Sequence, residues 1–370
     1  MSTKIHSYDK VVYFLQGGGA LGSYQVGVCQ ALLEYGCTPD WVVGTSIGAI
    51  NAAIIAGNKP EHRIKKLEKF WNVITSIAPT IPFLIQNYYT REIQNYWSAQ
   101  LSLFFGQPGF FLPRLINPWA HYSSSPELLS FYDTSELRET LLEIIDFDLI
   151  NTKKNIRITL GAVKVETGET VRFDNAHQKI HVEHIMASAA LPPGFPAIKI
   201  DDEYYWDGGL SSNTPFSVIL EEKIPEKLLC FIVNLFSYKK HIPTSLMDVM
   251  KCKKELEYAS RHMELLHHFL ELHYLQHIIG RLAKTELDNN DIKQALKKIS
   301  DAGHPTALNI IRFHYRDQPS DLWSKDFDFS YQSIRDHWRC GYNDAETALK
   351  KDTWINRVID DSKGAVIQEF

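Results

Sequence analysis

The first 56 residues alternate short apolar runs with helical patterns, and a glycine-rich or sharp turn joins each run to the pattern after it. An apolar run at 11–16 ends at three glycines, 17–19, and apolar residues then recur at helical spacing over 20–35. A second apolar run at 41–43 precedes a helical segment of small and branched residues over 46–56. Strand–helix alternation of this length predicts an α/β fold, with a central, mostly parallel sheet that helices cover on both faces.

The alternation continues to about residue 240. Apolar spacing and turn residues predict helices at 60–75, 134–145 and 184–190, a hairpin of strands at 155–165 and 169–173, and strands at 204–206 and 228–235. Beyond Pro243 the pattern is helical to the end of the chain. We therefore expect a domain over 1–240 and a C-terminal helical extension over 241–370, which packs on the core or forms an interface.

The segment Gly44-Thr45-Ser46-Ile47-Gly48 is a G-x-S-x-G motif between a predicted strand and a predicted helix. In that context the motif is a nucleophile elbow, a turn so tight that Gly44 and Gly48 must lack side-chain bulk. The Ser46 hydroxyl would stand at the carboxyl edge of the sheet, above a helix N-terminus whose partial positive charge favours an anion formed on attack. The plainer interpretation is a turn with a helix-capping serine, but the flanking strand and helix favour the nucleophile.

A second turn, Gly17-Gly18-Gly19-Ala20-Leu21-Gly22, also joins a predicted strand to a helix. Glycines leave backbone N–H groups free to point at an anion. The motif fits G-x-G-x-x-G, but a dinucleotide site needs an acidic residue about 20 residues later, after the next strand, and Asp40 comes before that strand. An oxyanion hole beside a nucleophile suits the two turns better. A tight β–α turn without a ligand is the remaining alternative.

The third motif is Asp207-Gly208-Gly209, which follows a short predicted strand. Asp-Gly is also an ordinary hairpin turn, so the tripeptide alone decides little. A serine nucleophile needs a base to take its proton. Asp207 can be that base if it lies within hydrogen-bond reach of Ser46.

In this order, GGGALG at 17–22, GTSIG at 44–48 and DGG at 207–209 resemble the three motifs of the patatin-like phospholipase family. The segment MASAALPPGFP at 186–196 is similar to the approach of that family to its aspartate. Each motif alone is common, and the three together are specific. The resemblance covers roughly residues 10–240, and the region beyond looks like the helical extension of a bacterial subgroup.

The resemblance implies a three-layer α/β/α hydrolase with a Ser-Asp dyad, no catalytic histidine, no cofactor and no metal. Ser46 would attack an acyl carbonyl, and Asp207 would accept its proton and later activate water. The oxyanion would be held by backbone N–H groups of the glycine loop, Gly17, Gly18, Gly19 and Ala20. Many family members carry Arg or Lys where this chain has Leu21. Together with a net charge of −5, Leu21 weakens the case for an enzyme recruited electrostatically to anionic membranes.

Aromatic residues concentrate between Ile77 and Tyr122, where eleven occur although aromatics make up only 12% of the chain. Prolines interrupt any long helix there, at positions 79, 82, 108, 113 and 118. We interpret about 77–126 as an insertion in the sheet fold. It would be either an ordinary subdomain that caps the sheet, or a lid or lipid-facing wall over the active site. We favour a mixture, with buried contacts beneath an apolar acyl pocket.

Fifteen histidines leave two other chemistries open. A Ser-His-Asp triad would need one to reach Ser46, and the candidates lie in no recognisable motif: His177, His181, His184 and His241. A predicted helix also carries a cluster, His262, His267, His268, His273 and His277. His273 and His277 have the i,i+4 spacing of metal ligands, but no HExxH glutamate lies between them. We interpret the cluster as a solvated or capped helix face.

Composition excludes several classes of protein. The balance of 39 basic and 44 acidic residues lacks the electrostatic footprint of nucleic-acid binding. Five scattered cysteines, with no CxxC, fit a reducing cytosol and argue against structural zinc. The polar first ten residues and the lack of a run of about 18 apolar residues predict no signal peptide and no transmembrane helix. We expect a cytoplasmic protein that contacts membranes peripherally through the aromatic insertion and oligomerises, if at all, through its C-terminal region.

The function that we expect is lipid acyl hydrolysis by a phospholipase, lysophospholipase or esterase. A hydrolase or depolymerase for short-chain or hydroxyacyl esters is the rival within the enzyme class. From another class, a catalytically inactive lipid-binding or scaffolding protein is the alternative. Intact Ser46, Asp207 and glycines speak against such inactivation.

Overall fold

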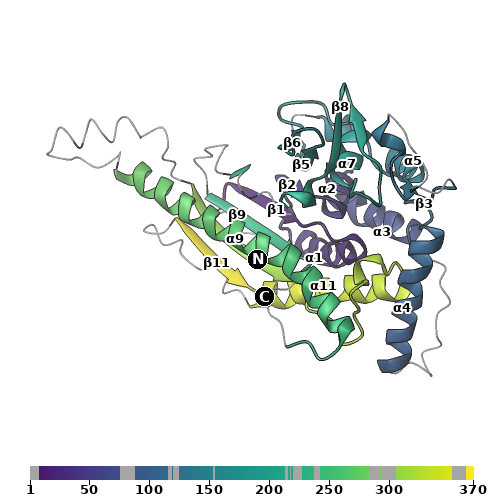
Figure 1. Cartoon of the computed structure of the whole chain (residues 1–370). Coiled ribbons are helices and arrows are strands. Elements are labelled where there is room, and N and C mark those ends of the chain that lie inside the picture. Colours follow the sequence, from purple (N-terminus) through teal and green to yellow (C-terminus); the bar gives the residue numbers. More distant parts are fainter. Residues whose placement is uncertain are drawn as a thin grey trace.

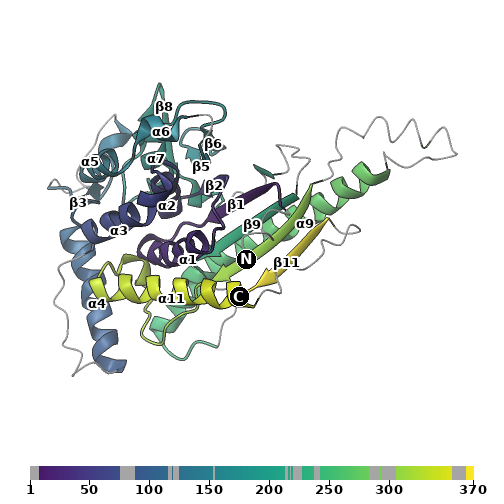
Figure 2. The ribbon, with the colours of Figure 1, turned by 180° about the vertical axis from the view of Figure 1, so that it is seen from behind.

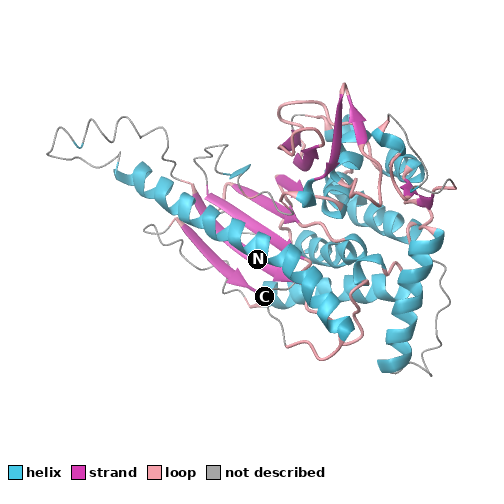
Figure 3. Cartoon of the chain, viewed as in Figure 1, coloured by secondary structure: helices cyan, strands magenta, loops and turns pink. Residues whose placement is uncertain are grey.

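The structure is a computed structural model, and it describes residues 8–75, 88–115, 119, 125–152, 155–212, 216, 218–219, 227–236, 242–282, 292, 306–351 and 364–370. Within these residues the fold is built on one large sheet with helices on both faces (Figures 1 and 3). The strands of the sheet are β1 (Lys10–Leu15), β2 (Trp41–Gly44), β5 (Arg157–Lys164), β6 (Thr170–Asp174), β7 (Ile198–Ile200), β8 (Glu203–Asp207), β9 (Lys227–Asn234), β10 (Ala307–His314) and β11 (Ala365–Glu369). A separate small hairpin is formed by β3 (Leu112–Pro113) and β4 (Tyr132–Asp133).

The sheet is mostly parallel, as the sequence predicts. Its order is β11-β10-β9-β1-β2-β5-β8-β7, and β6 also pairs with β5. The strands from β11 to β5 run parallel to one another, while β6, β7 and β8 are antiparallel additions. The register places Leu15 of β1 opposite Gly44 of β2, so the glycine loop and the serine turn leave the same edge of the sheet side by side.

Helices cover both faces of the sheet, which explains why its central strands are continuous apolar runs. The helices are α1 (Gly22–Glu34), α2 (Ile47–Ala56), α3 (Arg63–Val73), α4 (Tyr88–Phe105), α5 (Ser135–Ile144), α6 (Phe147–Ile150), α7 (Val182–Ser188), α9 (Leu246–Leu282) and α11 (Tyr331–Lys350). Val11, Tyr13 and Leu15 of β1 face the core shared with α1, α2 and α11. Val12 and Phe14 face the opposite core, which includes Leu266 and Phe269 of α9. The three-layer α/β/α arrangement is therefore confirmed, and α1 and α11 come to the front when the molecule is turned (Figure 2).

The C-terminal part differs from the all-helical prediction. The helices α9 and α11 are present, but β10 and β11 are strands, and β10 pairs in parallel with β9 along its full length. Both are short runs rich in apolar residues. Their backbone N–H and C=O groups are satisfied because β10 pairs with β9 and β11 pairs with β10. The division of the chain at about residue 240 stays a prediction, although both sides of it contribute to one sheet.

The helix α11 ties the C-terminal part to the first helix of the chain. The Tyr24 hydroxyl of α1 donates a hydrogen bond to Asp344 Oδ2 of α11 at 2.8 Å. The Trp338 indole N–H donates to Gln30 Oε1 at 2.7 Å. Because α1 starts directly after the glycine loop, these contacts bring the C-terminal residues close to the candidate site.

The aromatic segment is described only in part, and Phe83 and Tyr122 lie outside the described residues. Contrary to the expectation that prolines interrupt any long helix, α4 extends over 18 residues. None of the five prolines falls between Tyr88 and Phe105 in the sequence, so proline does not interrupt this helix. That the segment is an insertion stays a prediction. In the described part of the chain, no helix combines the length and the apolar character needed to cross a bilayer.

Candidate active site

Ser46 lies in the sharp turn between β2 and α2, and its backbone has φ 57° and ψ −129°. A positive φ is strained for any residue with a side chain. A Cβ atom added to Gly44 would lie 2.4 Å from the Gly48 carbonyl oxygen, and one added to Gly48 would lie 2.1 Å from that of Leu15. Both positions therefore require glycine, and the turn has the geometry of a nucleophile elbow.

The strained turn is held by Ser188, the last residue of α7. The Ser46 backbone N–H donates to the Ser188 carbonyl at 3.0 Å and also lies 3.3 Å from Ser188 Oγ. Ser188 Oγ in turn donates to the Gly161 carbonyl of β5 at 2.6 Å. Sequence reasoning noticed the segment around Ser188 only as an approach to Asp207, and the contact to Ser46 was missed.

Asp207 ends β8, which pairs with β5, and its side chain is buried at 1% exposure. Its Oδ1 accepts a hydrogen bond from the Gly209 N–H at 2.7 Å, and its own N–H donates to the Ala190 carbonyl at 3.0 Å. Burial raises the pKa of Asp207 to about 7, although side-chain hydrogen bonding with Ser46 and the Gly209 N–H both lower it. The pair thus lies within interaction range.

The two oxygens of the Asp207 carboxyl group differ in their contacts. Oδ1 accepts from Gly209, whereas Oδ2 is buried and has no hydrogen-bond partner among the described residues. Catalytic hydrogen bonds are often long in unliganded sites and shorten when substrate binds. Ser46 and Asp207 line the same cavity, and an oxygen of the carboxyl group remains free there to accept a hydrogen bond from a residue or a ligand.

The glycine loop follows β1, and β1 is the neighbour of β2, which leads into the serine turn. Gln16 fixes its start, because its Oε1 accepts from the Leu235 N–H at 2.7 Å and its carbonyl accepts from Gln25 Nε2 at 2.6 Å. Gly19 has a φ of 55°. Within the described residues, the backbone N–H groups of Gly18 and Gly19 donate no hydrogen bond. The oxyanion hole was predicted to include Gly17 and Ala20 as well; Gly17 lines the cavity with Gly18 and Gly19, whereas Ala20 is fully buried and does not.

A cavity of about 70 Å³ joins the three motifs. Its polar side carries Gly17, Gly18, Gly19, Ser46, Asp207 and Gly209. Its apolar walls are Phe110, Phe111, Leu191, Phe195, Phe236, Tyr258, Phe327 and Phe329, with Ile47 and Ala189. Phe110 and Phe111 belong to the aromatic segment, which the sequence analysis expected to contribute to an apolar pocket. Tyr258, Phe327 and Phe329 come from the C-terminal part, and sequence reasoning missed them because no local signal marks them.

The C-terminal contribution is held by ion pairs with α9, of which the pair of Lys325 with Glu255 is buried. A Cβ atom added to Gly19 would lie 2.3 Å from the Asp326 carbonyl oxygen, so this segment touches the glycine loop directly. The Asp326 carboxylate pairs with Lys254 of α9 at 2.5 Å. The neighbouring Lys325, 4% exposed, pairs with Glu255 of α9, 1% exposed, and with Asp317. One wall of the cavity is therefore anchored to α9.

The histidines considered from the sequence lie elsewhere. His184 Nδ1 accepts from the His181 N–H at 2.9 Å, His177 faces Arg157, and no histidine is among the described residues that line the cavity. His241 lies outside the described residues. The interpretation of the α9 cluster as a solvated face is wrong for His273 and His277, which are buried. Nε2 of His273 lies 3.1 Å from the Gly364 carbonyl oxygen. No group of three metal-binding side chains is placed to hold an ion in the part of the chain that is described.

Comparison with known families decides the membership of the chain. The family model described as patatin-like phospholipase matches residues 13–220, which is more than half of the chain. The chain belongs to the patatin-like phospholipase family. A second model, described as patatin phospholipase, matches residues 256–361. The similarity to this family thus includes the C-terminal part that supplies Tyr258, Phe327 and Phe329 to the cavity wall.

Individual relatives in this family match over short stretches. Patatin-like phospholipase domain-containing protein 7 of Rattus norvegicus is 38% identical over 79 residues, which is 21% of this chain and 6% of the rat protein. Triacylglycerol lipase SDP1L of Arabidopsis thaliana is 26% identical over 69 residues, 19% of this chain and 9% of that protein. The chain therefore covers less than a tenth of either relative.

Among solved structures, the crystal structure of VipD from Legionella pneumophila is similar over 98% of this chain and 72% of VipD, at 14% identity and a TM-score of 0.38.

Proposed function

We propose that the protein is a lipid acyl hydrolase in which Ser46 and Asp207 act as a catalytic dyad. The observation that carries the proposal is the meeting of three features in one cavity. They are a serine in a strained elbow, a buried carboxyl group with a pKa of about 7, and a glycine loop in which the N–H groups of Gly18 and Gly19 donate no hydrogen bond within the described residues. Family membership supports hydrolysis of lipid esters, and the names of the relatives include phospholipase and triacylglycerol lipase.

In the first half of the reaction, Ser46 Oγ attacks the carbonyl carbon of an ester. Asp207, as the carboxylate, takes the hydroxyl proton, and the carbonyl oxygen becomes an oxyanion. The N–H groups of Gly18 and Gly19 bind that oxygen. Fixed hydrogen-bond donors lower the barrier most at this step, because the negative charge develops there. The tetrahedral intermediate collapses to an acyl-Ser46 ester, and the departing alcohol receives the proton from Asp207.

In the second half, water attacks the acyl-Ser46 carbonyl and gives its proton to Asp207. The oxyanion again forms at the glycine loop, and collapse releases the fatty acid and returns the proton to Ser46. A base with a pKa of about 7 suits both halves, because it can accept and return a proton near neutral pH. The chemistry requires no group beyond these residues and water.

The test is hydrolysis of p-nitrophenyl esters and of phospholipid by the full chain. We expect turnover by the wild type and a loss of about 10³-fold or more in both Ser46→Ala and Asp207→Asn. Ser135→Ala is the matched control, since Ser135 is a serine whose hydroxyl bonds Asp133 Oδ1 at 2.5 Å and does not line the cavity. Near-normal turnover by Asp207→Asn would eliminate the dyad, and normal turnover by Ser46→Ala would eliminate the whole proposal.

A short-chain ester hydrolase is the second candidate, and the small size of the cavity favours it. About 70 Å³ is open to the centre of a water-sized molecule, which is little space for a long acyl chain unless the apolar wall moves. Turnover across p-nitrophenyl esters from butyrate to palmitate separates the two. A sharp optimum at butyrate would favour the short-chain enzyme over the lipase.

A further inference from the structure

Helix α4 has the reverse of the usual amphipathic arrangement. Its inner face is polar or small and buried, with each side chain at 5% exposure or less: Gln94, Asn95, Ser98, Ala99 and Ser102. Its outer face is apolar and exposed: Ile93 at 56%, Tyr96 at 40%, Trp97 at 60%, Phe104 at 72% and Phe105 at 72%. We call this outer surface the aromatic face. A surface helix normally points its apolar stripe at the core, so water alone does not explain this orientation.

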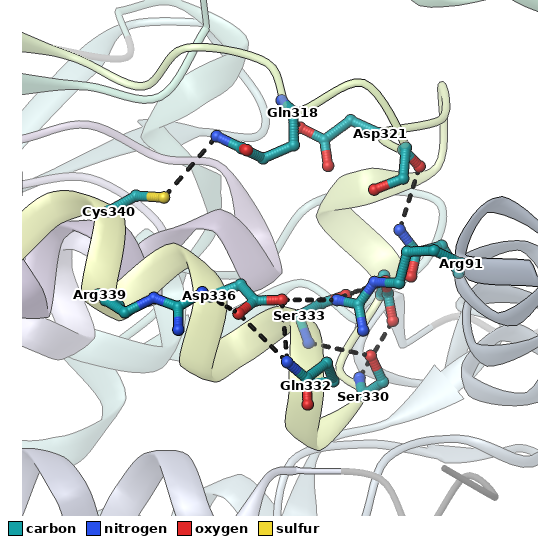
Figure 4. Close-up of polar contacts among 12 residues, drawn as sticks. Arg91, Gln318, Asp321, Ser330, Gln332, Ser333, Asp336, Arg339 and Cys340 are labelled. Atoms are coloured by element: carbon teal, nitrogen blue, oxygen red, sulfur yellow. Dashed lines mark hydrogen bonds and ion pairs between the residues drawn. The ribbon is translucent and has the colours of Figure 1, made fainter. Parts of the chain in front are cut away.

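The orientation of α4 is fixed by polar contacts on its inner side. Arg91 Nη2 lies 3.1 Å from both Ser333 Oγ and Asp336 Oδ2 of α11, as Figure 4 shows. The Asn95 side chain donates to the Ser320 carbonyl at 3.1 Å. These bonds hold the polar side against the C-terminal part, and both overall views place α4 at the margin of the molecule. The aromatic face is thereby directed outward.

The C-terminal end of the aromatic face lies close in the chain to residues of the candidate active site. Immediately after Phe105 the chain turns back through a bridge between Gln107 and Phe111, and Phe110 and Phe111 are cavity walls. The Tyr132 hydroxyl donates to the Leu103 carbonyl of α4 at 2.7 Å, and its ring packs on Phe111 at 4.8 Å. A molecule that is bound at the end of α4 therefore contacts a segment that leads directly to the cavity wall at Phe110 and Phe111.

Charge is almost absent from the segment that carries the aromatic face. From Ile93 to Leu115, Arg114 is the one charged residue in the sequence, and its guanidinium pairs with Asp133 at 3.3 Å. Trp, Tyr and Phe side chains without charge suit the boundary between lipid head groups and acyl chains. An anionic surface would instead call for exposed basic residues.

We propose that the aromatic face docks the protein on a zwitterionic phospholipid bilayer, so that a lipid can pass from the bilayer to the cavity beside Phe110 and Phe111. The inference rests on the proposed lipid acyl hydrolysis. It adds which surface meets the bilayer and which kind of bilayer that surface selects. Docking depends on buried apolar area and not on charge, so it is insensitive to salt.

The test is sedimentation of the full-length Ser46→Ala variant with phosphatidylcholine vesicles, since that variant leaves the lipid intact. Adding Phe104→Ala and Phe105→Ala is expected to weaken binding about tenfold or more, and Trp97→Ala alone to weaken it measurably. The matched control is Leu272→Ala with Leu275→Ala, two leucines of α9 that are 53% and 55% exposed. The control is expected to bind like its parent, with or without added salt.

With Ser46 intact, Phe104→Ala/Phe105→Ala is expected to lose hydrolysis of vesicle phospholipid and to keep hydrolysis of soluble p-nitrophenyl butyrate. Unchanged vesicle binding by the double variant would overturn the inference. So would binding that needs phosphatidylglycerol and disappears with salt, or a dimer of the parent that the same substitutions dissociate. Vesicle binding without any ester hydrolysis would overturn the proposed function and leave the docking surface standing.

Discussion

Replacing Asp207 by Asn is predicted to stabilise the fold at alkaline pH while abolishing activity. The carboxyl group is buried, and its pKa rises from the ordinary 3.8 to about 7. A difference of that size corresponds to about 4 kcal/mol of free energy between the protonated and the ionised group. Asparagine is neutral at every pH, so it does not bear the cost of burying a charge.

The sign of the pH dependence follows from the raised pKa. Because folded Asp207 holds its proton more tightly than the unfolded chain does, wild-type stability from this group is fully present below about pH 4 and is lost as pH rises through about 7. Relative to the wild type, Asp207→Asn should therefore gain up to about 4 kcal/mol between about pH 4 and about pH 8. Amide N–H groups without acceptors would lower the stability of the variant by the same amount at every pH, so the change of the difference with pH is not affected.

Urea unfolding of both proteins at several pH values measures this difference. Asp202→Asn is the matched control, because it makes the same substitution at an exposed residue of the turn between β7 and β8. The kinetic counterpart is a wild-type kcat/KM that falls about tenfold per pH unit below about pH 7. A stability difference for Asp207→Asn that does not change with pH would refute the account of a buried, proton-holding carboxyl group.

Three other substitutions test how the site is held. Ser188→Ala should lower kcat for p-nitrophenyl butyrate about tenfold at unchanged KM, because the elbow loses its contact with the Ser188 hydroxyl. Ser188→Thr keeps a hydroxyl and should restore part of kcat. Equal effects on kcat and KM would contradict a positioning role. Gly19→Ala places a Cβ at positive φ against a backbone carbonyl and should cost about 1–3 kcal/mol in urea unfolding, whereas wild-type stability would show that the loop is not confined. Lys325→Met leaves Glu255 buried without its cation and should cost about 3–5 kcal/mol in the same measurement, and an unchanged midpoint would contradict the buried pair.

The local half of the site could be predicted from the sequence. The strand, turn and helix around Ser46 depend on near neighbours, on glycines that leave room for a tight turn and on apolar periodicity. The register that brings Asp207 near Ser46 is set by the pairing of β8 with β5, which no local pattern encodes. The closeness of Asp207 to Ser46 was therefore expected only because the three motifs resemble those of the patatin-like phospholipase family.

The far wall of the cavity and the orientation of α4 could not be predicted. Phe327 and Phe329 reach the cavity because β10 pairs with β9 and returns the chain to the glycine loop, a contact between segments far apart in sequence. In α4, apolar periodicity identifies a stripe but assumes that it faces the core. The buried contacts of Arg91 and Asn95 give the opposite orientation.

The central claim is that Ser46 is a nucleophile activated in this cavity, and covalent labelling tests it most directly. The full chain is incubated with a fluorophosphonate, with a known serine hydrolase in parallel, and the modified peptide is identified by mass spectrometry. We predict one added phosphonyl group on Ser46, slower labelling below about pH 7 and none in Ser46→Ala. An unlabelled Ser46 beside a fully labelled reference enzyme would contradict the enzyme account and favour a lipid-binding protein without catalysis.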